Sequence, residues 1–121
     1  MKQFNLIFTV MFTVIILSGY IFAQDPVKVD PKHYKVVLEN DQVRVLRITY
    51  VPGEKSVMHE HPNSVAVLLT DRHMKMTLMD GKTIMSDGKK GEVVYTPARK
   101  HLPENIGDKS MELILVEMKT K

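Results

Sequence analysis

The sequence predicts an all-β fold, arranged as a sandwich or a small barrel. From Tyr34 onward the apolar residues form short runs rich in Val, Ile and Leu, and these runs are separated by Gly, Pro, Asn and Asp. No stretch of this region carries the 3.6-residue period of an amphipathic helix over three turns. Many short, closely spaced strands are typical of a sandwich or a small barrel.

About eight runs have the length and composition of strands. We predict strands over residues 35–38, 43–51, 55–59, 65–69, 74–79, 83–86, 92–96 and 111–119. Asp80 and Gly81 lie between two of these runs, and such a pair supplies positive φ in a tight hairpin. Residues 71–72 and 87–91 predict further turns.

Alternation of residue types predicts which side chains face the core. The strand over 43–51 is mixed on both faces, so its core face stays undecided. The strand over 111–119 is apolar on both faces, which predicts a central strand or one pressed against a partner subunit. The methionines in strand positions are predicted to fill the core, namely Met74, Met76, Met79 and Met85.

Composition excludes several classes of protein. The chain has 121 residues with 44% hydrophobic and 26% charged residues, which suits one globular domain. A formal charge of +3, spread over single basic residues, does not predict nucleic-acid binding. The absence of cysteine excludes a disulfide scaffold, an iron–sulfur site and a thiol nucleophile. Any metal must therefore be held by oxygen ligands or by the five histidines.

Residues 1–23 have the pattern of a secretory signal peptide. Lys2 is followed by an apolar stretch over 6–17, by Ser18, Gly19 and Tyr20, and by a small residue at Ala23, after which cleavage is expected. The alternative is an uncleaved membrane anchor. We expect a polar lead-in over 24–33 and a β-barrel domain over 34–121, periplasmic or secreted, with no stable membrane association after cleavage. A domain this small buries a modest core, which favours a homodimer.

The histidines provide the functional signal. His59 and His61 are two residues apart, so on an extended segment both imidazoles leave the same face with Cα atoms roughly 6.6 Å apart. Two side chains can close that span onto one cation. The alternative is a pair of solvated histidines at a strand end. His33 and His73 lie in polar segments and are predicted to be surface residues.

Two spaced motifs make the chain resemble the cupins. The first motif consists of Gly53, five residues and His59-x-His61. The second consists of Gly91, five residues, Pro97, a short turn, His101, three residues and Asn105. The resemblance covers roughly residues 34–119. It implies a double-stranded β-helix, or jelly-roll barrel, with His59, His61 and His101 as ligands of one divalent metal, which is Fe, Mn, Zn or Ni.

The sequence departs from the cupin pattern at two places. The acidic ligand expected shortly after the second histidine is replaced by Val65 and Ala66. Arg99 stands where the family usually has Gly, so the turn there must differ or carry strain. Glu60 and Glu104 are expected either to contact the ligating histidines without touching the metal or to lie at the surface.

The candidate small-molecule contacts lie around the second motif. Arg99 and Lys100 form either a cationic lip that attracts carboxylates or a solvated loop pair, and Tyr95 supplies either a hydroxyl or a packed aromatic ring. Asn105 completes this set of candidate contacts. No hydrolase triad, phosphate loop or glycosidase carboxylate pair is evident.

The resemblance and the open metal positions predict three alternative functions. The first is an iron- or manganese-dependent dioxygenase or an isomerase acting on a small polar acid or a carbonyl compound. The second is a module that binds a metal or a small molecule without turnover. The third is a barrel that has lost its metal and keeps His59 and His61 as hydrogen-bonding residues.

Overall fold

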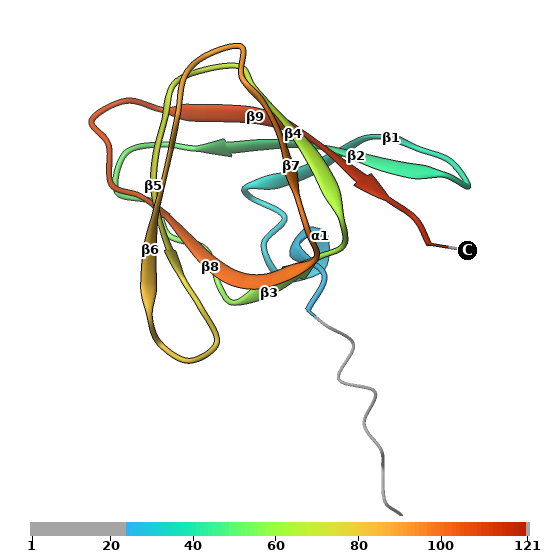
Figure 1. Ribbon diagram of the computed structural model, residues 1–121, viewed down its shortest axis with the longest axis horizontal. Helices are drawn as coiled ribbons and strands as arrows, with labels where there is room; N and C mark the ends of the chain where they lie inside the picture. Colours follow the sequence, from blue (N-terminus) through green and yellow to red (C-terminus); the bar gives the residue numbers. More distant parts are fainter. Residues whose placement is uncertain (1–23, 121) are drawn as a thin grey trace, which may run out of the picture.

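The computed structural model describes residues 24–120 and consists of two antiparallel sheets and one short helix (Figure 1). The predicted signal peptide over 1–23 lies outside the described residues. No helix within 24–120 is long and apolar enough to cross a membrane. In chain order the elements are α1 Pro26–Val29, β1 Tyr34–Glu39, β2 Val43–Tyr50, β3 His59–His61, β4 Ser64–Leu68, β5 Arg72–Thr77, β6 Thr83–Gly88, β7 Val93–Thr96, β8 Arg99–Asn105 and β9 Met111–Met118.

The two sheets wrap around a common interior. One sheet has the strand order β1-β2-β9-β4-β7 and the other β3-β8-β5-β6, and every pair within them is antiparallel. Strands far apart in the chain therefore become neighbours, as β3 and β8 do across nearly forty residues. The all-β prediction is confirmed. The pairing of β3 with β8 also joins the two sequence motifs that the resemblance rests on.

The predicted strands agree with the structure except in the two segments that contain the histidine motifs. The strand predicted over 55–59 is wrong: β3 covers only His59–His61, and Lys55 forms a single bridge with Glu104. Strand β8 was not predicted at all. Its inward residues are polar or Pro, so it lacks the apolar alternation by which a strand is recognised. Pro103 has no backbone donor, and its carbonyl accepts a hydrogen bond from the Ser56 amide at 2.9 Å.

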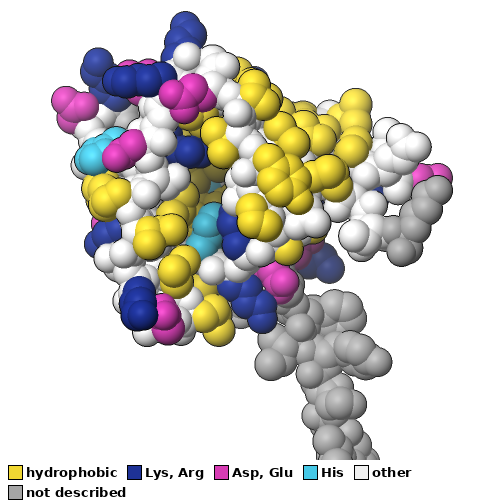
Figure 2. All heavy atoms as spheres, in the orientation of Figure 1, with side chains coloured by type: hydrophobic (Ala, Val, Ile, Leu, Met, Phe, Trp, Pro, Cys, Tyr) yellow, Lys and Arg dark blue, Asp and Glu magenta, His cyan; other side chains and the backbone are white. Residues whose placement is uncertain are grey.

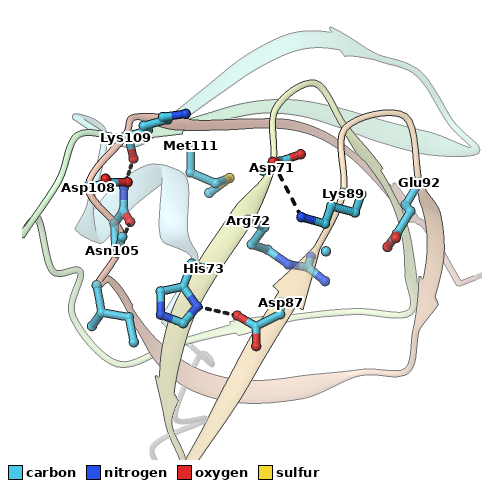
Figure 3. A pocket seen from close by; sticks show the side chains of 13 residues that line it. Asp71, Arg72, His73, Asp87, Lys89, Glu92, Asn105, Asp108, Lys109 and Met111 are labelled. Carbon is cyan, nitrogen blue, oxygen red and sulfur yellow. Dashed lines mark hydrogen bonds and ion pairs between the residues drawn. The ribbon is translucent and has the colours of Figure 1, made fainter.

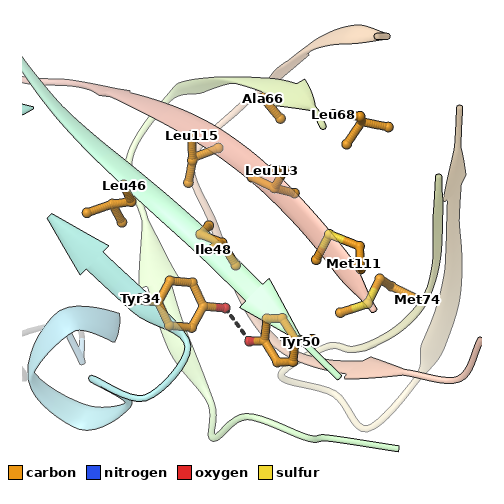
Figure 4. Close-up of a cluster of buried hydrophobic side chains, with 10 residues drawn as sticks. All are labelled: Tyr34, Leu46, Ile48, Tyr50, Ala66, Leu68, Met74, Met111, Leu113 and Leu115. Carbon is orange, nitrogen blue, oxygen red and sulfur yellow. Dashed lines mark hydrogen bonds between the residues drawn. The ribbon is translucent and has the colours of Figure 1, made fainter. Parts of the chain in front are cut away.

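The core lies between the sheets and consists of ten buried hydrophobic side chains (Figure 4). The core face of β2 carries Leu46, Ile48 and Tyr50, and β9 is the central strand of its sheet, as one of the two alternatives predicted. The Tyr34 and Tyr50 hydroxyls are hydrogen bonded at 2.5 Å inside this core. These two buried hydroxyls thus satisfy each other in the apolar interior.

The methionine prediction is half correct. Met74 is buried and Met76 packs against the core. Met79 and Met85 are exposed, at 66% and 51%, so the prediction that they fill the core is wrong. Met79 lies in the turn after β5 and Met85 lies on β6, which has only one neighbouring strand. The predicted Asp80–Gly81 hairpin joins these strands, and Gly81 has a φ of 83°.

Residues 24–33, expected as a polar lead-in, contain the one-turn helix α1 and pack onto the barrel. Asp25 caps the helix through the Val27 amide and forms an ion pair with Arg44. The prediction that His33 is a surface residue is wrong, because His33 is 5% exposed and stacks on Tyr50 with ring centroids 4.1 Å apart. His73 is exposed as predicted.

Candidate metal centre

The register of β3 against β8 brings the three histidines of the two motifs together. His59 pairs directly with His101, and His61 pairs with Arg99. Since side chains alternate along a strand, these four residues point to the same face. That face is the barrel interior, where His59 and His61 are 1% exposed and His101 is 6% exposed. The alternative of solvated histidines at a strand end is therefore wrong.

The imidazole nitrogens converge on one point. One potential ligand atom from each histidine lies within 4.8 Å of those from the other two. The Nε2 atoms of His59 and His61 are 3.0 Å apart. Nitrogens bound to one ion at about 2.0–2.1 Å lie roughly 2.8–3.4 Å from one another at octahedral or tetrahedral angles. The His59–His61 pair has this spacing, and the three histidines together could hold one metal ion.

Hydrogen bonds to the outer nitrogens assign the tautomers of two of these histidines. His59 Nδ1 donates to the Val57 carbonyl at 2.8 Å, and His61 Nδ1 donates to Glu117 Oε2 at 2.8 Å. A neutral imidazole with its proton on Nδ1 keeps a lone pair on Nε2. The two Nε2 lone pairs then face each other at 3.0 Å, a repulsive contact that a shared cation relieves.

His101 completes the donor set with an unsatisfied atom. Its Nε2 is buried and has no hydrogen-bond partner. A buried polar atom without a partner is costly in an ordinary interior and is expected where an ion binds. The three rings also stand nearly perpendicular to one another, with centroids 4.8, 5.0 and 5.3 Å apart. These features fit a site built for a metal.

Burial keeps the three imidazoles neutral. Loss of solvation, reinforced by the neighbouring histidine, lowers the pKa of His59 to about 4. The same causes, with Arg99 added, lower the pKa of His101 to about 2. Desolvation also lowers the pKa of His61, although Glu117 opposes it. Histidines that are neutral at physiological pH can bind a metal without first losing a proton.

Glu117 is the site residue that sequence reasoning missed. It lies on β9, is 2% exposed, and bonds His61 Nδ1 through one oxygen and Arg44 Nε through the other, at 2.8 and 2.7 Å. Burial acts to raise its pKa, but the bonds from His61 and Arg44 outweigh burial and leave the pKa lowered. A carboxylate behind a ligating histidine fixes its ring and increases its basicity.

A signal for Glu117 was present in the sequence. The inward positions of β9 are Met111, Leu113 and Leu115, and Glu117 continues the same alternation. An acidic residue at an inward position of a central apolar strand needs a partner, which marks it as part of a buried site. The acidic ligand missing near Val65 is not replaced by Glu117, which approaches His61 from the outer nitrogen.

A cavity of about 360 Å³ adjoins the histidines inside the barrel. Figure 2 shows a hollow in which a histidine and a basic side chain lie side by side, surrounded by hydrophobic side chains. His61, His101, Arg99 and Tyr95 line this cavity. Tyr95 is 59% exposed, so the alternative of a packed aromatic ring is wrong and its ring lies at the rim.

The other candidate contacts are placed differently. Lys100 points away from the cavity and pairs with Glu60 at 3.9 Å. The Asn105 amide donates to the Tyr50 and Lys109 carbonyls and accepts from the Gly107 amide, so it holds the β8–β9 connection.

The structure also corrects the expectation of strain at Arg99. Within 24–120 no residue other than Gly has positive φ. Arg99 is the first residue of the extended strand β8, so it never enters the left-handed region that the family's Gly implied. Nor do Arg99 and Lys100 form a solvated loop pair, because they leave opposite faces of that strand.

A second cavity of about 830 Å³ lies elsewhere on the barrel, lined largely by charged side chains (Figure 3). His73 bonds Asp87 at 2.5 Å, and Lys89 lies 3.9 Å from Asp71. These charges neutralise one another at exposed positions, where ion pairs contribute little. Among residues 24–120 the only cluster of three metal-binding side chains is that of His59, His61 and His101.

Comparison with known proteins identifies the fold. No family model matches the chain, and no curated protein matches it. A cupin domain from Bordetella pertussis Tohama I superposes with a TM-score of 0.67 and 22% identity, covering 72% of this chain and 92% of that one. An RmlC-like cupin family protein with a double-stranded β-helix fold from Methanocaldococcus jannaschii gives 0.56 and 21%, with coverages of 70% and 77%. The chain therefore has the cupin fold, as the two motifs implied.

We predict that Glu117→Gln weakens metal binding by roughly tenfold or more, since partners that orient a ligating histidine contribute 10- to 100-fold to affinity. The measurement is competition with a chelator for Zn²⁺ or Mn²⁺. Glu112→Gln is the matched control, because Glu112 lies on the same strand and pairs only with the exposed Arg47. Equal affinities of the two variants would contradict this role of Glu117.

The lowered histidine pKa values predict a pH dependence of stability in the metal-free protein. Unfolded histidines take up protons near pH 6.5, whereas folded His59 and His101 stay neutral down to about 4 and about 2. Stability is therefore complete above pH 6.5 and falls below it, by about 1.4 kcal/mol per pH unit for each histidine.

Urea unfolding at about pH 7.5 and about pH 5.5 measures this loss before most carboxylates titrate. His101→Gln should lose less stability between these two pH values than the unmodified protein. A loss in His101→Gln equal to that of the unmodified protein would refute the assignment.

Proposed function

We propose that the protein is an exported metal-dependent enzyme that binds one divalent metal through His59, His61 and His101 and processes a small molecule in the adjoining cavity. The observation that carries this proposal is the buried convergence of three neutral imidazoles, two of which, those of His61 and His101, line a cavity inside the barrel. The reaction classes favoured are those of a dioxygenase or an isomerase acting on an acid or an enolisable carbonyl compound.

The donor set determines what a bound metal can do. Three neutral ligands leave the charge of a divalent ion uncompensated and do not fill the four to six positions such ions use. A metal held in this way would supply Lewis-acid polarisation of a substrate oxygen. Imidazole ligands suit Fe, Zn and Ni, and also Mn when other positions hold oxygen donors.

The chain's own residues position the imidazoles and exclude water. Val57 and Glu117 hold the protons of His59 and His61 on the outer nitrogens, so the inner nitrogens stay free. The Tyr34 ring packs edge-on against His59 with centroids 4.8 Å apart. Apolar side chains form most of the cavity wall, which lowers the local dielectric around a bound substrate.

A specific observation favours the second candidate, a binding module without turnover. No carboxylate lines the cavity beside the histidines within the described part of the chain. Burial raises the pKa of Tyr34 and of Tyr50, so neither phenol is a base near neutral pH. A metal-bound small molecule would then lack an obvious proton acceptor.

Metal analysis is the first test. The purified protein should contain close to one divalent metal per chain, and His61→Ala should lose it. His73→Ala is the matched control, because His73 is exposed and lies outside the cluster. A metal content that is negligible in the unmodified protein, or equal in both variants, would refute the proposed centre. Oxygen uptake with diketones, thiols and aromatic acids then separates an oxygenase from a binding module.

Export is the second part of the proposal and is supported by the pattern of residues 1–23. N-terminal sequencing of protein recovered from expressing cells should begin at Gln24. A sequence that begins at Met1 in the membrane fraction would instead indicate an uncleaved anchor.

A further inference from the structure

Arg99 places a positive charge at the metal centre without an acidic partner. It lies two residues before His101 on the inward face of β8 and directly across from His61. Its Nη1 donates to Ser64 Oγ at 3.1 Å and to the Pro97 carbonyl at 3.4 Å. Within residues 24–120, no carboxylate oxygen lies within 4.0 Å of its guanidinium nitrogens. These two neutral acceptors leave most of its five donors available.

The nearby acid is already committed. Glu117 exerts an attraction on Arg99, but its two oxygens bond His61 and Arg44. Burial lowers the pKa of Arg99 to about 10, so the guanidinium remains protonated at neutral pH. A partly buried cation next to three neutral imidazoles lacks a compensating charge, so binding of an anion there is favourable. Arg44 and Arg47 by contrast each pair with a carboxylate.

The cavity that Arg99 faces is mostly apolar. Its wall includes Met74, Met76, Ile84, Met85, Leu113 and Leu115, and no acidic residue lines it. Unbranched methionine side chains adapt to ligands of irregular shape.

Arg72 is the second arginine that lines the cavity. It lines both cavities of the barrel, and Glu92 and Asp87 attract it, although its buried Nε has no hydrogen-bond partner among residues 24–120. Figure 3 shows Arg72 among the acidic side chains of the second cavity. Arg99 differs from Arg72 in its place directly across from His61, and the acid that attracts it, Glu117, is already bonded to His61 and Arg44.

We infer that the cavity binds a carboxylic acid with an apolar body, with the carboxylate on Arg99 beside His61 and His101 and the body against the methionine-lined wall. Arg99 acts here as a specificity-determining residue and is not a metal ligand. The inference rests on the proposed function, since both concern one site, and it replaces the small polar acid expected from the sequence. Lys100, which leaves the opposite face of β8, has no part in it.

Calorimetric titration of the full mature chain, as purified and with its metal content measured, tests this inference with octanoate as the probe. Arg99→Gln should weaken octanoate binding by roughly 10- to 100-fold, the loss expected for a charge-assisted hydrogen-bonded pair. Lys100→Gln is the matched control, because it removes the same charge from the next residue, and it should change the affinity by less than about twofold.

A second probe shows whether the cavity survives the substitution. 1-Octanol has the same apolar body without the charge, and it should bind Arg99→Gln and the unmodified protein equally. Failure of octanoate to bind the unmodified protein at millimolar concentration, or equal octanoate affinities of the two variants, overturns the inference even where metal is bound. Weaker octanoate binding by Arg99→Gln, with octanol binding unchanged, supports the inference. The same result in protein that holds no metal also supports the inference, while the proposed metal centre would be refuted.

Discussion

The register of β3 against β8 is the constraint on which the rest of the site depends. Pairing His59 with His101 and His61 with Arg99 turns all four side chains to the barrel interior. A shift of one residue along either strand would exchange these for their neighbours, because side chains alternate. Glu60 and Lys100 would then be buried in place of the imidazoles and the guanidinium. The chemistry of the interior is therefore set by backbone pairing between segments distant in the chain.

A series of charged contacts that ends at the outer nitrogen of His61 supports this register. Asp25 bonds Arg44, Arg44 bonds Glu117, and Glu117 bonds His61. The residues come from the segment before the barrel and from three strands of the two sheets. Each buried charge in the series has a partner of opposite sign or a donor, so the network avoids the cost of an isolated charge. Arg99 is the exception beside the metal centre, and that contrast gives the cavity its preference for an anion.

The strengths and failures of sequence prediction have physical causes in particular residues. Strands that consist of runs rich in Val, Ile and Leu, such as β2 and β9, were predicted within one or two residues of their observed bounds. Strand β8 was missed because its inward residues serve the site rather than the core. His33 was predicted at the surface because its neighbours in the sequence are polar, yet it stacks on Tyr50 from β2. Glu117 was missed because His61 and Arg44, whose hydrogen bonds compensate its buried charge, lie 56 and 73 positions away in the sequence.

The amino-acid sequence by itself determined the all-β class and the hairpin at Gly81, because these follow from the composition of short runs and from turn chemistry. The choice of three histidines came from the resemblance of two short motifs to those of the cupins. Only the tertiary structure decided that His101 meets His59, that Glu117 holds His61, and that Arg99 faces an apolar cavity without an acid. Those facts depend on which strands become neighbours across the two sheets. Such pairing is selected by the burial of the whole interior, a quantity that no short stretch of sequence contains.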